Sequence, residues 1–252
     1  MATTTGNQST APTGFVSIDE TDTGTMSFYR RNGYMVVPDM LPSFLCDKAI
    51  EVANTLETAA SGSFLTAMQP HRKAAIYLDI LRYPPIRSRM ELIIGPPVVG
   101  LATQFYYCPP GSSGLMRHQD NFCVEAPVEQ FASCWIPLVD VDETNGCLTV
   151  FPGSHRQGML PVRTLAPHEM RATYRNMLEE TVVAPGEKGI ALPLKRGTGV
   201  FLHGAVVHES GPNRAQDFRY AFLGTYLRKG ATFRPGNTAN RHEIVLDGGW
   251  PE

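Results

Sequence analysis

The chain has 252 residues, of which 42% are hydrophobic and 18% charged, and its formal net charge is −2. This length can bury the core of one domain, and the near-neutral charge gives no electrostatic reason to expect nucleic acid or an anionic membrane as a partner. No run approaches the roughly 20 apolar residues that span a bilayer, and residues 1–14 do not have the form of a secretory signal. We expect a cytoplasmic protein.

The cysteines are scattered, odd in number and never arranged as CxxC. This spacing argues against both a disulfide framework and a zinc ribbon. We predict free thiols in a reducing compartment at Cys46, Cys108, Cys123, Cys134 and Cys147.

Residues 1–24 are rich in Thr, Ser, Gly and Asp, so we expect a flexible lead-in before a single domain over residues 25–252. A short helix is predicted over residues 26–33, and a strand follows over residues 34–37. The strongest helix signal begins near Ser43. Its apolar stripe, with spacings of four, four and three, consists of Leu45, Ala49, Ala53 and Leu56.

A further helix is predicted over residues 85–94, where Pro85 suits the first turn and Gly95 ends the element. After residue 98, short runs rich in aromatic and β-branched residues alternate with turn residues. These runs cover residues 101–108, 131–139, 147–151, 199–202, 218–227 and 243–246. Many short strands predict an antiparallel sandwich or barrel. We therefore expect a mostly β fold flanked by N-terminal α-helices.

A charged insertion over residues 163–180 interrupts the strands, and we expect some helix there. It either supplies Arg171 or Arg175 to an anionic substrate as a lid or forms a solvated helical face.

Metal-binding residue types first appear together at His118 and Asp120. In a strand, alternate residues point to the same face, so both side chains would project into one cavity. An imidazole nitrogen and a carboxylate oxygen can then occupy two neighbouring positions around a metal. The pair alone is a weak signal, because such tripeptides occur by chance.

A further histidine, His208, follows an apolar, strand-like run. Two histidines and one carboxylate form the facial triad that suits Fe(II), because it leaves three coordination positions open. The thiolate or three-nitrogen ligand sets typical of zinc hydrolases are absent from the pattern. His203 is the rival ligand, but its five-residue offset would place it on the opposite face of a regular strand.

A candidate carboxylate anchor, Arg219, follows on the next predicted strand. Its planar guanidinium suits bidentate capture of a carboxylate, such as the distal 5-carboxylate of 2-oxoglutarate. Ser210 shares a face with His208 and can bind the same carboxylate. Arg214 is the competing candidate, but it lies in the turn, where a solvated arginine is the ordinary outcome.

Four motifs together resemble the phytanoyl-CoA dioxygenase family of Fe(II)/2-oxoglutarate-dependent oxygenases. They are RHQDN (117–121), ETNGCL (143–148), FPGSH (151–155) and HESGPN (208–213), the last followed by Arg219. The resemblance covers roughly residues 26–228. It implies a double-stranded β-helix, a jelly-roll or cupin-like barrel, that uses iron with 2-oxoglutarate and O2 as co-substrates.

Carried over position by position, the family's iron ligands fall on His118, Asp120 and His208. Its co-substrate contacts fall on Arg219, Ser210 and, on an earlier strand, Gln104. No catalytic residue beyond the metal ligands is implied. Because Asp120 fills the position that related halogenases leave open for chloride, the resemblance favours oxygen transfer over halogenation.

The implied reaction hydroxylates an unactivated C–H position and releases succinate and CO2. Desaturation, cyclisation and epimerisation use the same chemistry and stay open. We expect a small metabolite or natural-product intermediate as the substrate, which would make this a biosynthetic enzyme. Substrate contacts are expected from residues near the triad that hold no metal: Tyr106, Met116, Asn121, Phe122 and Trp135. His155 is interpreted as a turn residue or a pocket wall.

Two alternatives remain. A cupin-type metal-dependent isomerase or epimerase would not use 2-oxoglutarate, and Arg219 and Ser210 would then have no reason to accompany the triad. A non-catalytic β-sandwich binding protein would be expected to have lost a ligand. The sequence leaves the oligomeric state open, with a homodimer as one option.

Overall fold

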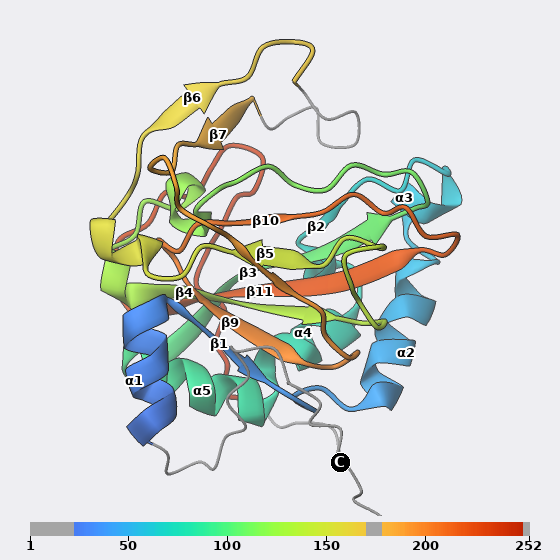
Figure 1. Ribbon diagram of the computed structural model, residues 1–252. Helices are drawn as coiled ribbons and strands as arrows, with labels where there is room; N and C mark the ends of the chain where they lie inside the picture. Colours follow the sequence, from blue (N-terminus) through green and yellow to red (C-terminus); the bar gives the residue numbers. More distant parts are fainter. Residues whose placement is uncertain (1–22, 170–177, 249–252) are drawn as a thin grey trace, which may run out of the picture.

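Two antiparallel sheets form the centre of the computed structural model, which describes residues 23–169 and 178–248 (Figure 1). In these ranges, the larger sheet has six strands in the order β1-β9-β4-β11-β3-β2 and the smaller one has three in the order β10-β5-β8. The larger sheet contains β1 (Tyr34–Val37), β2 (Ala67–Met68), β3 (Val98–Cys108), β4 (Phe131–Pro137), β9 (Gly199–His203) and β11 (Arg219–Arg228). The smaller contains β5 (Leu148–Val150), β8 (Ile190–Leu192) and β10 (His208–Ser210). This arrangement confirms the predicted antiparallel β core.

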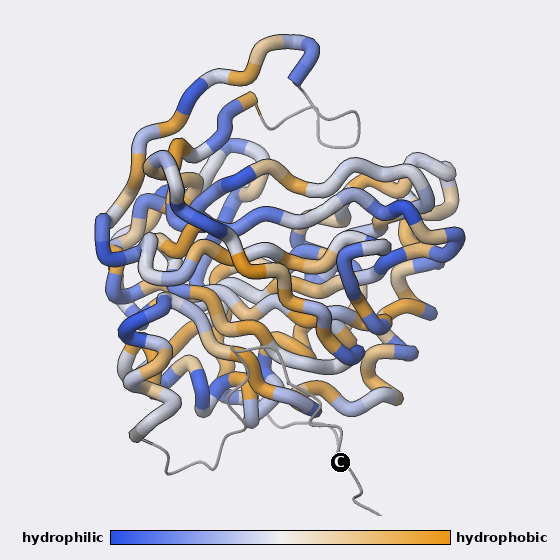
Figure 2. The backbone as a smooth tube through the Cα atoms, viewed as in Figure 1, coloured by the Kyte–Doolittle hydropathy of each residue, from blue (hydrophilic) through white to orange (hydrophobic). Residues whose placement is uncertain are grey.

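Alternation along β3 explains how one sheet serves two apolar layers. Phe105 and Tyr107 pack in the cluster that includes the helices, whereas Tyr106 and Cys108 pack in the cluster between the sheets. Successive side chains of a strand point to opposite faces, so a strand buried on both faces is apolar throughout. In Figure 2 the apolar segments accordingly run through the centre of the molecule.

Helices cover the outer face of the larger sheet (Figure 1). The α-helices are α1 (Thr23–Asn32), α2 (Ser43–Ala53), α3 (Glu57–Ala60), α4 (Ala75–Arg82) and α5 (Pro84–Ile94). The short 3-10 helices of the described ranges are η1 (Pro70–Arg72), η2 (Asp120–Cys123), η3 (Val128–Gln130) and η4 (Ser154–Gln157). The stripe predicted for α2 is confirmed for Leu45, Ala49 and Ala53, which are buried. Its fourth member, Leu56, lies beyond the end of α2 and is half-buried. In the described ranges, none of the helices combines the length and apolar character needed to cross a membrane.

Several element bounds differ from the predictions, most of them by one or two residues. The first helix begins at Thr23, so the last two residues of the expected lead-in are helical; residues 1–22 lie outside the described residues. β3 begins at Val98, three residues early. The strand predicted over residues 243–246 is wrong: it is reduced to one bridge between Gly100 and Ile244.

The described ends of the insertion form strands β6 (Val162–Thr164) and β7 (Glu179–Thr181), so the expected helix is wrong there. Arg163 and Glu180 are direct cross-strand partners. The Glu180 carboxylate is 4% exposed and lies 2.6 Å from a nitrogen of Arg163 and 2.7 Å from a nitrogen of Arg117. Opposite charges facing each other across two strands stabilise their pairing. Arg171 and Arg175 lie outside the described residues.

We expect Glu180→Ala to loosen the β6–β7 hairpin, because it leaves two guanidinium groups without their buried partner. Breaking a fully buried pair costs about 3–5 kcal/mol, and the 44% exposure of Arg163 reduces the expected loss to about 1–3 kcal/mol. Thermal unfolding and the rate of proteolysis within residues 163–180 would measure the effect. Glu169→Ala removes the outer contact of Arg163 and the hydrogen bond from the N–H of Ala166 but keeps Glu180, so it should change both less. Equal proteolysis of Glu180→Ala and the parent protein would contradict the expectation.

Acid sensitivity is expected from one buried and two half-buried histidines outside the predicted metal site: His203, His71 and His155. Burial lowers the pKa of His71 to about 4 and also lowers the pKa values of His155 and His203. The unfolded chain, with a histidine pKa near 6.5, therefore binds protons first as the pH falls. For His71 the contribution to stability is complete above about pH 6.5 and is lost between about pH 6.5 and 4, and His155 and His203 act in the same direction. The thermal unfolding midpoint should be lower at pH 5 than at pH 7, and this decrease should be smaller in His71→Gln than in the parent protein. Equal decreases in the two proteins would show that His71 does not contribute to the acid sensitivity.

Candidate metal centre

The backbone holds His118 and His208 directly opposite each other. The two residues form an isolated antiparallel bridge, in which each N–H donates to the other's carbonyl at 2.9 and 3.0 Å. Their ring centroids lie 4.2 Å apart. Strand β10 thus begins at His208, and His118 lies in the segment just before η2.

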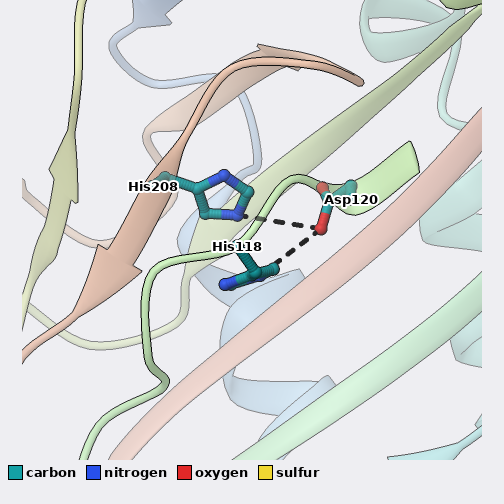
Figure 3. A group of neighbouring side chains, drawn as sticks. All are labelled: His118, Asp120 and His208. Atoms are coloured by element: carbon teal, nitrogen blue, oxygen red, sulfur yellow. Dashed lines mark ion pairs between the residues drawn. The ribbon is translucent and has the colours of Figure 1, made fainter. Parts of the chain in front are cut away.

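Asp120 completes the cluster from the start of η2 (Figure 3). Its Oδ1 lies 3.6 Å from His118 Nε2 and 3.7 Å from His208 Nε2. One donor atom from each of the three residues lies within 4.8 Å of the others. The strand expected over this motif is therefore wrong, because the chain turns into a 3-10 helix at Asp120.

The backbone of Gln119 is extended, and its side chain points to the side opposite His118 and Asp120, as the predicted alternation of side chains requires. There its Nε2 donates to the carbonyls of Ala205 and Gly158, and its Oε1 accepts from the N–H of Leu160. Gln119 therefore ties the motif to the segment that leads into His208.

Both histidines present the same ring nitrogen to the cluster. His118 Nδ1 lies 2.8 Å from the carbonyl of Met116, and His208 Nδ1 lies 3.1 Å from the carbonyl of Val206. Each carbonyl accepts a hydrogen bond, so Nδ1 carries a proton in both rings and Nε2 is the nitrogen turned towards Asp120. This second contact is the usual way in which proteins orient a metal-binding imidazole.

The charges of the cluster suit a cation. Burial opposes ionisation of Asp120, but His208 and His118 outweigh it and hold the pKa of the carboxyl well below its usual range. Burial, reinforced by His118, lowers the pKa of His208 to about 4. Burial also opposes a charge on His118, yet its hydrogen bond and attraction to Asp120 raise its pKa. An ionised carboxylate beside a neutral imidazole is the donor set that a divalent metal requires.

Arg219 lies nearby as a buried cation. It is 3% exposed, at the start of β11. One terminal nitrogen donates to the carbonyl of Gly146, the other lies 2.7 Å from Cys108 Sγ, and Nε is buried without a partner. Among the described residues, no carboxylate is paired with this guanidinium. A buried charge without a counter-charge is costly, so these residues fit an anionic ligand.

The competing Arg214 is exposed in the turn after β10. Ser210 lies two residues beyond His208, and its hydroxyl oxygen accepts from the N–H of Leu115. Gln104 lies behind Tyr106, and its Oε1 accepts a hydrogen bond from the Tyr106 hydroxyl at 2.7 Å. Gln104 thus touches the wall of the pocket rather than lining it.

One pocket brings together the metal cluster, the arginine and part of the expected substrate wall. It is lined by Tyr106, Leu115, His118, Asp120, Trp135, Leu148, His208, Glu209, Ser210, Arg219 and Leu223. Of the residues predicted to contact substrate, Tyr106 and Trp135 are present. Leu115, Leu148, Glu209 and Leu223 also line the pocket and were not predicted to contact substrate. Strand alternation offered a signal for Leu223, which faces Trp135 across β4 and β11.

The other three expected substrate residues do not line this pocket. The buried amide of Asn121 donates to the carbonyl of Ala126 and accepts from its N–H. Phe122 is 38% exposed on η2. Met116 contributes its carbonyl to His118, as described above.

His203 lies apart from the cluster, as expected, but for a different reason. The chain turns at Gly204 and Ala205, so no regular strand connects His203 to His208 and the parity argument was wrong. Its ring packs 4.9 Å from that of His155. His155 in turn packs on Gly33, whose φ is +81°, and a Cβ there would lie 2.4 Å from His155 Nδ1. This contact supports the interpretation of His155 as a turn residue.

Comparisons with known proteins agree with this geometry. A family model described as Phytanoyl-CoA dioxygenase (PhyH) matches residues 29–221. The peroxisomal phytanoyl-CoA dioxygenase of Homo sapiens is 24% identical over 77% of this chain and 64% of its own length. Phytanoyl-CoA dioxygenase domain-containing protein 1 of Mus musculus is 26% identical over 66% of this chain and 58% of its own length. The chain thus spans less than two thirds of either relative.

Among solved structures, the epimerase SnoN in complex with Fe3+, alpha ketoglutarate and nogalamycin RO is similar, with a TM-score of 0.67. It is 23% identical, and the match covers 84% of this chain and 85% of that one. At this identity the likeness is one of fold, and it confirms the predicted double-stranded β-helix.

Proposed function

The chain belongs to the phytanoyl-CoA dioxygenase family of Fe(II)- and 2-oxoglutarate-dependent oxygenases, and from this premise we propose that it hydroxylates an unactivated C–H position of a small metabolite or natural-product intermediate. The reaction releases succinate and CO2. The observation that carries the proposal is the convergence of two imidazole nitrogens and one carboxylate oxygen within 4.8 Å.

In this proposal, iron is held by His118 Nε2, Asp120 Oδ1 and His208 Nε2. The carbonyls of Met116 and Val206 support the assignment, because they fix both rings with Nε2 turned towards Asp120. A bound iron with 2-oxoglutarate and O2 supplies the oxidising power, and three protein ligands leave three positions for these co-substrates. The protein itself orients the reactants and excludes water.

Arg219 and Ser210 bind the distal carboxylate of 2-oxoglutarate. The absence of a paired carboxylate at Arg219 among the described residues supports this role, because the co-substrate would supply the counter-charge. A cupin-type isomerase without 2-oxoglutarate would have no use for such a cation. The intact donor set likewise favours an enzyme over a binding protein.

The apolar part of the substrate packs against Tyr106, Trp135 and Leu223, which form one wall of the pocket. The human relative is named for an acyl-CoA thioester and SnoN is solved with nogalamycin RO, so the names of similar proteins point to very different substrates. A wall of this kind favours a substrate with an apolar body over a purely polar one. All five cysteines are free thiols, which supports a reducing compartment such as the cytoplasm.

The test is a succinate-release screen over a metabolite panel with Fe(II), ascorbate and 2-oxoglutarate. A product heavier by one oxygen atom supports hydroxylation. A product lacking two hydrogens indicates desaturation or cyclisation, and inverted configuration at unchanged mass indicates epimerisation. Succinate release that persists in Asp120→Ala would exclude the proposed metal site.

A further inference from the structure

The carboxylate of Asp120 has a second contact, on the side away from the histidines. We propose that Ser133 is a positioning residue that makes Asp120 a one-oxygen ligand. The Ser133 hydroxyl donates to Asp120 Oδ2 at 2.6 Å, while Oδ1 faces both imidazoles. The inference rests on the proposed role of Asp120 as a metal ligand.

Ser133 is rigidly placed. It is fully buried in β4, a central strand of the larger sheet. Its backbone pairs with Leu202 of β9 on one side and with Thr225 of β11 on the other. A residue held between two strands keeps its hydroxyl at a fixed point, and a hydrogen bond to a carboxylate at this distance is among the strong ones. The sheet therefore sets the rotation of the Asp120 carboxyl group, although η2 carries that residue.

This contact determines how many metal positions the protein uses. With Oδ2 engaged by Ser133, Asp120 offers one oxygen, and the three ligands occupy three positions. A carboxylate free to rotate can bind a metal through both oxygens and would take a position that the co-substrates need. Loss of such an outer contact typically weakens metal binding 10–100-fold.

The test uses Mn(II), a redox-stable ion that suits the same donors, titrated calorimetrically into the metal-free protein. We expect Ser133→Ala to bind Mn(II) about 10–100-fold more weakly. Its bound Mn(II) should also carry fewer exchangeable waters by proton relaxation, because Oδ2 is released to bind. Ser133→Thr keeps the hydroxyl and should restore the affinity and the hydration.

Thr225→Ala is the matched control. Thr225 lies directly opposite Ser133, is also buried, and its hydroxyl donates to the carbonyl of Ala102 rather than to Asp120. It should bind Mn(II) like the parent protein. If Ser133→Ala does not fold by circular dichroism, Ser133→Cys, close in volume and a weaker donor, should show an intermediate affinity.

Two failures are distinguishable. Parent-like Mn(II) affinity and hydration in a folded Ser133→Ala or Ser133→Cys would overturn the role of Ser133 alone. If the parent protein does not bind Mn(II), or Asp120→Ala binds it equally well, the proposed metal site itself is wrong.

Discussion

Asp120→Ala is expected to abolish succinate release and to weaken Mn(II) binding by more than the 10–100-fold expected for an outer contact. Asp120 is the only carboxylate in the cluster and supplies its negative charge. Two neutral imidazoles remain in the variant, and each is a weaker partner for a hard divalent cation than a carboxylate. Calorimetric titration and succinate assay measure the two effects separately.

Asp140→Ala is the control for this change, because Asp140 is an exposed aspartate that pairs with Lys195 at 2.6 Å. It should leave both measurements unchanged. Metal binding that survives in Asp120→Ala but fails in His208→Ala would show that another carboxylate completes the site.

Arg219→Ala is expected to raise the half-saturating concentration of 2-oxoglutarate by about two to three and a half orders of magnitude. A buried, bidentate pair between a guanidinium and a carboxylate loses about 3–5 kcal/mol when one partner is removed, and each 1.4 kcal/mol is tenfold. The affinity for Mn(II) alone should stay close to that of the parent protein, because Arg219 does not belong to the metal cluster. Succinate release at varied 2-oxoglutarate gives the first value and calorimetry the second.

Arg214→Ala is the matched control, since this exposed arginine lies five residues earlier in the chain. It should leave the 2-oxoglutarate requirement unchanged. Arg219→Lys, which keeps the charge but not the planar fork, should fall between the two. If Arg214→Ala raised the 2-oxoglutarate requirement strongly and Arg219→Ala did not, Arg214 rather than Arg219 would be the residue that binds the distal carboxylate.

Regular elements were predictable where burial follows a simple period. The strand over residues 34–37 and the buried stripe of α2 match their predictions, because both patterns reflect packing against the sheet. The helix α4 was missed. Its eight residues, AIYLDILR, are mostly large and apolar, and such a short run does not distinguish a helix from a buried strand. The hairpin β6–β7 was missed because its pairing depends on contacts between distant segments.

The metal cluster was predictable from residue types, but its surroundings were not. His118, Asp120 and His208 could be identified because two histidines and one carboxylate form a donor set that suits Fe(II). Ser133 gave no local signal, since its contact with Asp120 exists only once β4 and η2 are packed together. Asn121 was predicted to contact substrate because it lies next to Asp120 in the sequence. In the structure it does not line the pocket, because its side chain bonds to Ala126 instead.

The bridge between His118 and His208 links the centre to the folding of the chain. An ion held by both residues would join two segments that are distant in sequence, and it would do so only in the folded state. Because the unfolded chain lacks the preformed cluster, the folded state gains stability as the free metal concentration rises. The same contacts that would present iron to its co-substrates thus also fasten the smaller sheet to the start of η2.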